Sequence, residues 1–157
     1  MNVYLHIHQL KQHNHIELQD NIRYLYPKKN TIMNGDFTKI LFSRCNVTMN
    51  GLYLYLPFKV HDVNDHNHVR QLVCNHIQNQ QLIHDLKNIE NVLLNNYMDY
   101  NNIHKYCEYV LYNQLVTNQI RVYRNSNKPI NNKYVIKISG IWETTDKIGL
   151  TYKIMEV

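Results

Sequence analysis

The 157-residue sequence contains no alanine, only four glycines and three prolines, and a single tryptophan. Neither a glycine-rich phosphate loop nor a GxSxG nucleophile elbow occurs in it. The 12 acidic residues are scattered along the chain, so paired carboxylates for acid–base catalysis are scarce. These absences disfavour the common enzyme classes, and we expect neither catalytic activity nor a cofactor.

Cysteines and long apolar runs are also rare. Cys45, Cys74 and Cys107 are widely spaced and form no CxxC pair, so we expect neither a zinc site nor a disulfide framework. No apolar run is long enough to span a membrane, and we expect no membrane partner. The first residues, MNVYLHIHQLKQHNH, lack the apolar core of a signal peptide. The sequence therefore predicts a soluble intracellular protein.

The length predicts one domain over residues 1–157, large enough to bury about two-thirds of its unfolded surface. The formal net charge is +5, which makes an acidic partner plausible and nucleic acid the first candidate. A basic surface without any partner explains the charge equally well, so charge alone leaves the choice open.

Strands are predicted at both ends of the chain. VYLHIHQL alternates apolar and polar residues, and residues 37–45 and 47–60 are dense in β-branched and aromatic residues, which favours a hairpin between these two segments. In the sequence GLYLYL the leucines face one side and Tyr53 and Tyr55 the other. Near the C-terminus, YVIKISGIW and IGLTYKIMEV are predicted strands joined by the compact turn ETTDK.

The middle of the chain changes period. After a loop-like stretch at 20–36 and a polar break at 61–68, apolar residues recur every three or four positions at 69–97 and again at 103–115, which predicts two helices. A short alternating run, QIRVYR, follows them. The order strands, helices, strands predicts an α+β fold: an antiparallel sheet or OB-like barrel with a two-helix insertion in the middle.

Histidine-rich stretches raise the question of a metal. His6 and His8 share one strand face, as do His13 and His15 if that segment is extended, but pairs of this kind supply only part of a ligand set. A metal-dependent nuclease is the least favoured reading, and it would use His61, Asp62, Asp65, His66 and His68.

Aromatic and basic residues that alternate with apolar ones on the predicted strands are more informative. Bases stack on aromatic rings with little regard to sequence, and Lys and Arg follow the phosphates of a single strand. Structural tyrosines that only cover a sheet are the alternative for each residue taken singly. The candidate nucleic-acid-binding residues are Lys39, Arg44, Tyr53, Tyr55, Lys59, Arg121, Tyr123, Arg124, Lys137 and Lys153.

The tail YVIKISGIWETTDKIGLTYKI resembles the closing hairpin of single-stranded-DNA-binding proteins of large DNA viruses, both baculovirus-like and nucleocytoplasmic. The segment FTKILFSRCNVTMNGLYLYLPF is similar to an earlier hairpin of the same proteins, and together the two cover about a third of the chain. The resemblance implies an OB-like fold that binds single strands during viral replication, recombination or repair, in the host nucleus or a viral replication compartment. It points to Gly51–Phe58 and Ile138–Lys153. The chain departs from the pattern in its large helical middle and in ending with KIMEV rather than an acidic tail.

Two hypotheses of different classes follow. The first is a viral single-stranded-DNA-binding protein without catalytic activity, with DNA favoured over RNA. The second is a viral structural or interaction module that has kept the scaffold and lost DNA binding. In that case the predicted helices at 82–97 and 103–115 would form an oligomer or host-protein interface.

Overall fold

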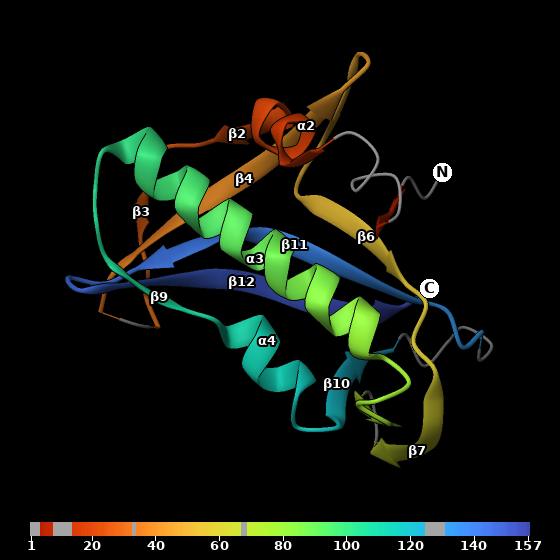
Figure 1. Cartoon of the computed structure of the whole chain (residues 1–157). Helices are drawn as coiled ribbons and strands as arrows, with labels where there is room; N and C mark the ends of the chain where they lie inside the picture. Colours follow the sequence, from red (N-terminus) through yellow and green to blue (C-terminus); the bar gives the residue numbers. More distant parts are fainter. Residues whose placement is uncertain (1–3, 8–13, 33, 67–68, 125–130) are drawn as a thin grey trace.

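Alternating apolar and polar residues near the C-terminus form two long strands at the centre of the sheet. β11 (Tyr134–Glu143) pairs antiparallel with β12 (Lys147–Glu156) in the computed structural model shown in Figure 1. The first half of β11 pairs with β6 (Leu52–Leu56) and the second half with β4 (Asp36–Arg44). The structure describes residues 4–7, 14–32, 34–66, 69–124 and 131–157, with the side chains of 14–17 and 66 left out.

The remaining strands extend this centre on both sides. The order is β1-β6-β11-β12-β10-β8-β7, with β2, β3 and β5 added to β4, and β9 added to β12. The bounds are Leu5–His6 for β1, Ile22–Tyr24 for β2, Lys28–Lys29 for β3, Val47–Met49 for β5, Val60–His66 for β7, Val69–Cys74 for β8, Tyr106–Glu108 for β9 and Gln119–Tyr123 for β10. Within the described ranges no pairing joins β1 to β7. The sheet is therefore open, so of the two expected alternatives, an antiparallel sheet or an OB-like barrel, the closed barrel is not formed. The sheet is not purely antiparallel either, because β1–β6, β9–β12 and β10–β12 are parallel pairs.

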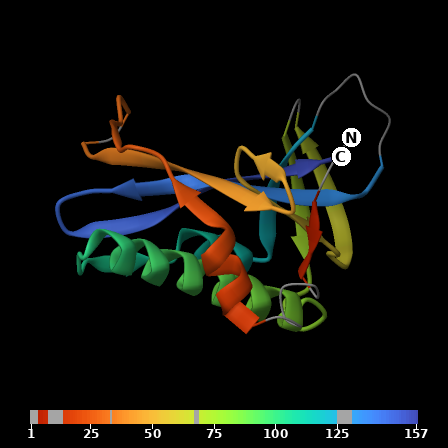
Figure 2. The ribbon, with the colours of Figure 1, turned by 90° about the horizontal axis from the view of Figure 1, so that it is seen from above.

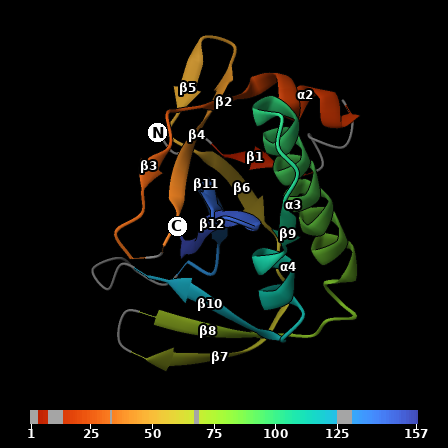
Figure 3. The same ribbon diagram turned by 90° about the vertical axis from the view of Figure 1, so that its left-hand side faces the viewer.

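Three helices lie on one face of this sheet. They are α2 (Asn14–Asn21), α3 (Gln80–Asn101) and α4 (Val110–Leu115), and Figure 2 shows all three on the same side of the central strands. In Figure 3 the strands β10, β8 and β7 curve below α3 and α4. Apolar residues of α3, such as Leu86 and Leu93, belong to the same buried cluster as Ile136, Ile138 and Ile154 of the sheet. The fold is thus α+β, as expected.

A buried glutamate attaches α4 to α3. Glu90 is fully buried, and its two carboxylate oxygens each accept a 3.0 Å hydrogen bond, one from the backbone N–H of Leu111 and the other from that of Tyr112. These N–H groups belong to the first turn of α4, where intrahelical acceptors are missing. The side chain of Tyr109, at the N-cap, makes no capping bond. A residue of another helix therefore caps α4.

The C-terminal end of α3 is tied to the sheet by hydrogen bonds. The hydroxyl of Tyr97 lies 3.2 Å from the hydroxyl of Thr38 on β4 and donates to Glu143 on β11 at 2.9 Å. Lys105, beyond the end of α3, donates to the same carboxylate at 2.8 Å. Burial raises the pKa of Tyr97 to about 12, so this hydroxyl stays protonated and can donate at neutral pH.

Two glycines allow aromatic rings to lie against the sheet. A Cβ atom on Gly149 would lie 2.3 Å from Cζ2 and 2.5 Å from Cε2 of Trp142, so the indole lies directly over this glycine. A Cβ atom on Gly140 would lie 2.7 Å from two ring atoms of Phe37, at the point where a bulge interrupts the pairing of β11 with β12. A backbone atom is nearer still, because the carbonyl oxygen of Thr38 would lie 2.3 Å from that Cβ atom.

Several predicted elements are confirmed. The C-terminal hairpin, the strand at 119–124 and the strand at 37–45 are present as β11–β12, β10 and β4. The predicted pairing of 37–45 with 47–60 is correct only for β5, because β6 pairs with β11 and β1 instead. The expected helical residues between 82 and 97 lie within α3.

Other predictions are wrong. Residues 69–74 form strand β8 instead of a helix, and the polar segment 60–66 forms strand β7 instead of a loop. In β8 the buried side chain of Arg70 is charged and takes an inward position usually held by an apolar residue, which hides the alternation of the strand. In place of one helix at 103–115 the chain forms β9 and then the short α4, while the loop-like stretch at 20–36 contains β2 and β3. The predicted two-helix insertion is therefore not confirmed.

No helix in the described part of the chain is long and apolar enough to cross a membrane. His8, His13 and His68, which we considered as metal ligands, lie outside the described residues, as does part of the N-terminal strand VYLHIHQL.

Gly149→Ala should displace Trp142 and lower the free energy of unfolding by about 1–3 kcal/mol, the usual cost of overpacking. In a Trp142→Leu background the same substitution should cost less, because the ring that it meets is gone. Urea unfolding of the four proteins measures both costs. An equal cost in the two backgrounds would show that contact with the indole ring is not what makes alanine unfavourable at position 149.

Glu90 predicts a pH dependence. Burial raises the pKa of its carboxyl group, while the two N–H donors act in the opposite direction. The folded protein thus binds this proton more tightly than the unfolded chain, so stability from Glu90 grows as the pH falls through its folded pKa and is lost as the pH rises. Relative to Glu90→Gln, the wild type should gain unfolding free energy between about pH 7 and about pH 5. Urea unfolding at both pH values checks this, and a constant difference would contradict it.

Candidate nucleic-acid interface

The face of the sheet that points away from the three helices, here called the outer face, is ordered into rows by strand register. Tyr55 of β6 lies opposite Val135 of β11, which lies opposite Met155 of β12, which pairs with Tyr123 of β10. Because side chains alternate along a strand, these four point to the same side. We call this set the aromatic row, since a tyrosine stands at each end.

A second row lies two residues along the same strands, about 7 Å away. Tyr53 is opposite Lys137, and Lys137 is opposite Lys153. The parallel register of β10 with β12 then places Arg121 beside Lys153. This set, the cationic row, carries three positive charges in four positions and runs parallel to the aromatic row.

The lysines lie against the tyrosine rings. Lys153 Nζ is 4.4 Å from the ring centroid of Tyr123, and Lys137 Nζ is 5.4 Å from that of Tyr53. Contacts of this kind contribute about 0.5–1 kcal/mol at exposed sites. Within the described ranges neither lysine forms an ion pair, so neither charge is neutralised by a carboxylate.

The outer face has a marked charge bias. Its outward positions on the five strands β4, β6, β10, β11 and β12 include no Asp or Glu among the described residues, but they include five cations. These are Lys39, Arg121, Lys137, Lys147 and Lys153. Several carboxylates instead lie on the helix side, among them Glu90, Glu143 and Glu156. On the adjoining strand β9, however, Glu108 is opposite Gly149 on the same face and lies 3.8 Å from Lys147. The attraction for a polyanion therefore comes from Lys39, Arg121, Lys137 and Lys153.

The structure does not bring all predicted residues together. Lys39 points outward on β4, beside Gly140 and toward the β11–β12 turn. Lys59 is exposed in the connection between β6 and β7. Arg44 ends β4 opposite Val47, on the side of the strand that it shares with the buried Phe42. Neither Arg44 nor Lys59 therefore belongs to the two rows.

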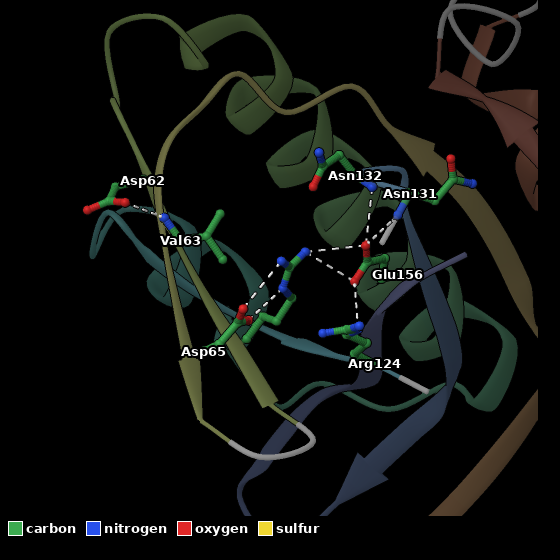
Figure 4. A network of polar contacts seen from close by, with 8 residues as sticks. Asp62, Val63, Asp65, Arg124, Asn131, Asn132 and Glu156 are labelled. Carbon is green, nitrogen blue, oxygen red and sulfur yellow. Dashed lines mark hydrogen bonds and ion pairs between the residues drawn. The ribbon is translucent and has the colours of Figure 1, made fainter. Parts of the chain in front are cut away.

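Arg124 belongs to a buried ion network on the inner side of the sheet (Figure 4). Its Nε lies 3.9 Å from a carboxylate oxygen of Glu156, whose side chain is only 4% exposed. Arg70 donates to Glu156 at 3.3 Å and to Asp65 at 2.6 Å, and the backbone N–H of Asn131 donates to Glu156 at 2.9 Å. The hydrogen bond to Asp65 raises the pKa of Arg70, so this guanidinium stays charged although it is buried.

Sequence reasoning missed the contribution of the N-terminal segment. The ring of Tyr4 stacks with that of Tyr55 at a centroid distance of 6.2 Å, and the ring of His6 meets Tyr55 edge-on at 5.3 Å. The alternation in VYLHIHQL could have indicated this, because Leu5 and Ile7 are buried and Tyr4 and His6 face the other way. These two residues extend the aromatic row by one strand.

Among the described residues, no group of three or more His, Cys, Asp or Glu residues is placed to bind a metal. Asp65 of the proposed ligand set is bonded to Arg70 instead. Burial raises the pKa of Cys74 to about 11 and also raises that of Cys107, which makes both thiols poor nucleophiles at neutral pH.

Comparisons of the chain with protein-family models, curated proteins and solved structures find no match.

Arg121 of β10 and Arg124, the residue after its end, provide a test, because their side chains lie on opposite sides of the sheet and both substitutions remove one charge. Arg121→Gln should weaken binding of an oligonucleotide by about fivefold at 0.1 M salt, because one phosphate contact is lost. Arg124→Gln should leave the affinity within about twofold of the wild type. Fluorescence anisotropy with a labelled oligo-dT measures both, and equal losses would contradict the assignment to faces.

Proposed function

We propose that this protein binds single-stranded nucleic acid on the outer face of its sheet, with little sequence preference and without catalysis. The observation that carries the proposal is the pair of parallel rows, one ending in tyrosines and one rich in cations, on four strands (β6, β10, β11 and β12) whose described outward positions hold no carboxylate. Bases would stack along the aromatic row while phosphates follow the cationic row.

Single strands suit this geometry better than duplexes. Base stacking needs an exposed base face, which a duplex hides, and each stacked base contributes about 1–3 kcal/mol. Tyr53 and Tyr55 are half-buried and Tyr123 is 39% exposed, so part of each ring is accessible. An open curved sheet exposes one face to solvent, as an OB-like barrel does. The proposal therefore keeps the exposed binding face that the viral resemblance implies.

On this proposal the protein acts in viral DNA replication, recombination or repair, in the host nucleus or a viral replication compartment, and DNA is favoured over RNA. These details rest on the resemblance of residues 134–154 and 37–58 to the viral proteins, while the stacking mechanism rests on the outer face.

A second candidate function is a structural or protein-interaction module. It is favoured by large apolar side chains that are exposed in the described molecule: Tyr26 and Ile32 at 92%, Tyr100 at 69% and Tyr106 at 68%. The apolar face of α3, which we considered as an oligomer interface, is occupied by the sheet. A tight oligomer that is indifferent to oligonucleotides in light scattering and filter binding would favour this candidate.

The paired substitution Tyr53→Ala with Tyr55→Ala should weaken binding to oligo-dT by about fivefold to a hundredfold, since one or two stacked bases lose their platform. The melting temperature should change far less than for a core substitution. Tyr100→Ala with Tyr112→Ala, on the helix side, is the matched control and should leave the affinity unchanged.

Anisotropy titrations of oligo-dT and of a duplex of equal length, repeated across salt concentrations, provide the measurement. Affinity should fall with salt through counterion release. Equal affinity for the two substrates would rule out stacking, and equal losses of affinity and stability in Tyr53→Ala with Tyr55→Ala would make these residues structural.

A further inference from the structure

A third group of aromatic and basic residues lies on the outer face, near the turn that joins β11 to β12. Lys28 of β3 is opposite Phe37 of β4, and Phe37 is opposite Trp142 of β11. We call this set the hairpin row. It crosses the sheet as the aromatic and cationic rows do, but at the other end of β11.

The two rings of the hairpin row are backed by glycines. Trp142 lies over Gly149 and Phe37 over Gly140, so the sheet supports one side of each ring while both residues remain partly exposed. A rigid aromatic surface supported from behind is what a stacking base requires. Lys28 is exposed, and within the described ranges its side chain forms no ion pair.

The surface between the cationic row and the hairpin row offers a path for a single strand of nucleic acid. Lys39 projects beside Gly140, between Lys137 and Trp142, and adds a cation midway. Thr151, which is opposite Gly140, has a small side chain, and the ring of Phe37 lies over Gly140 at this point of the path. Lys137 and Trp142 are five residues apart on β11, a distance of about 17 Å along the strand.

We infer that the hairpin row is a second subsite for the same single strand. The strand leaves the cationic row, passes Lys39, and stacks a base on Trp142 or Phe37 while Lys28 contacts a phosphate. This inference rests on the proposed function. A stacked strand advances about 3.4 Å per nucleotide, so at most about five nucleotides bridge the gap. Oligomers of about four nucleotides should occupy one subsite only, and oligomers of about sixteen should occupy both.

The test combines binding with the fluorescence of Trp142, the only tryptophan of the chain. Labelled dT4 and dT16 are titrated into the wild type, into Lys28→Gln with Lys39→Gln, and into the control Lys29→Gln with Lys87→Gln. Lys29 is the exposed neighbour of Lys28 and lies opposite Asp36, on the other side of β3, while Lys87 lies on α3. Both double variants lower the formal net charge from +5 by two, to +3.

In the wild type, dT16 should bind and quench Trp142. In Lys28→Gln with Lys39→Gln the affinity for dT16 should fall about tenfold or more at 0.1 M salt, and the slope of log affinity against log salt should drop by about 1.4. The control pair should behave as the wild type, and dT4 should bind all three proteins alike. A parallel titration with U16 shows whether the protein binds DNA or RNA more tightly.

Two failures are distinguishable. If the wild type binds no oligonucleotide, the proposed function fails and the subsite fails with it. If dT16 binds but leaves Trp142 unquenched, and both double variants lose affinity equally, the hairpin row is not a subsite although the other two rows are.

Discussion

The packing of α3 against one face of the sheet is the constraint on which the rest of the structure depends. This helix buries Leu86, Leu93 and Leu94 together with the inward side chains of the central strands, and it brings α4 with it through the carboxylate of Glu90. With all the described helices on one side, the opposite face of the same strands must be compatible with water. Tyrosine and lysine meet that requirement, because both combine apolar groups that cover the sheet with a polar end.

That arrangement explains which features were predictable. A strand alternates with a period of two whatever its partners are, so LYLYL, QIRVY and YVIKI were sufficient to place Tyr53, Arg121 and Lys137 on the side opposite the leucines and isoleucines. The pairing partners were not predictable in this way, because register is set by contacts between distant segments. The shared side of β6, β11, β12 and β10 became visible only in the structure.

Inward charges account for the clearest failures. Arg70 is buried at a position that looks polar in the sequence, and it is stable there only because Asp65 and Glu156 compensate its charge. No local pattern shows that a residue at 70 will meet one at 156. The same network includes Arg124, which resembles Arg121 in the sequence but lies on the other side of the strand. The cap of α4 by Glu90 is of the same kind, since its donor and acceptor are about twenty residues apart.

The cations of the outer face also have a kinetic meaning. A group of positive charges on one face attracts an approaching polyanion before contact and favours encounters at that face. Long-range attraction of this sort raises the rate of productive encounter and is screened over about 10 Å at 0.1 M salt. For this protein the arrangement of charge would therefore influence how quickly a strand is captured as well as how tightly it is held.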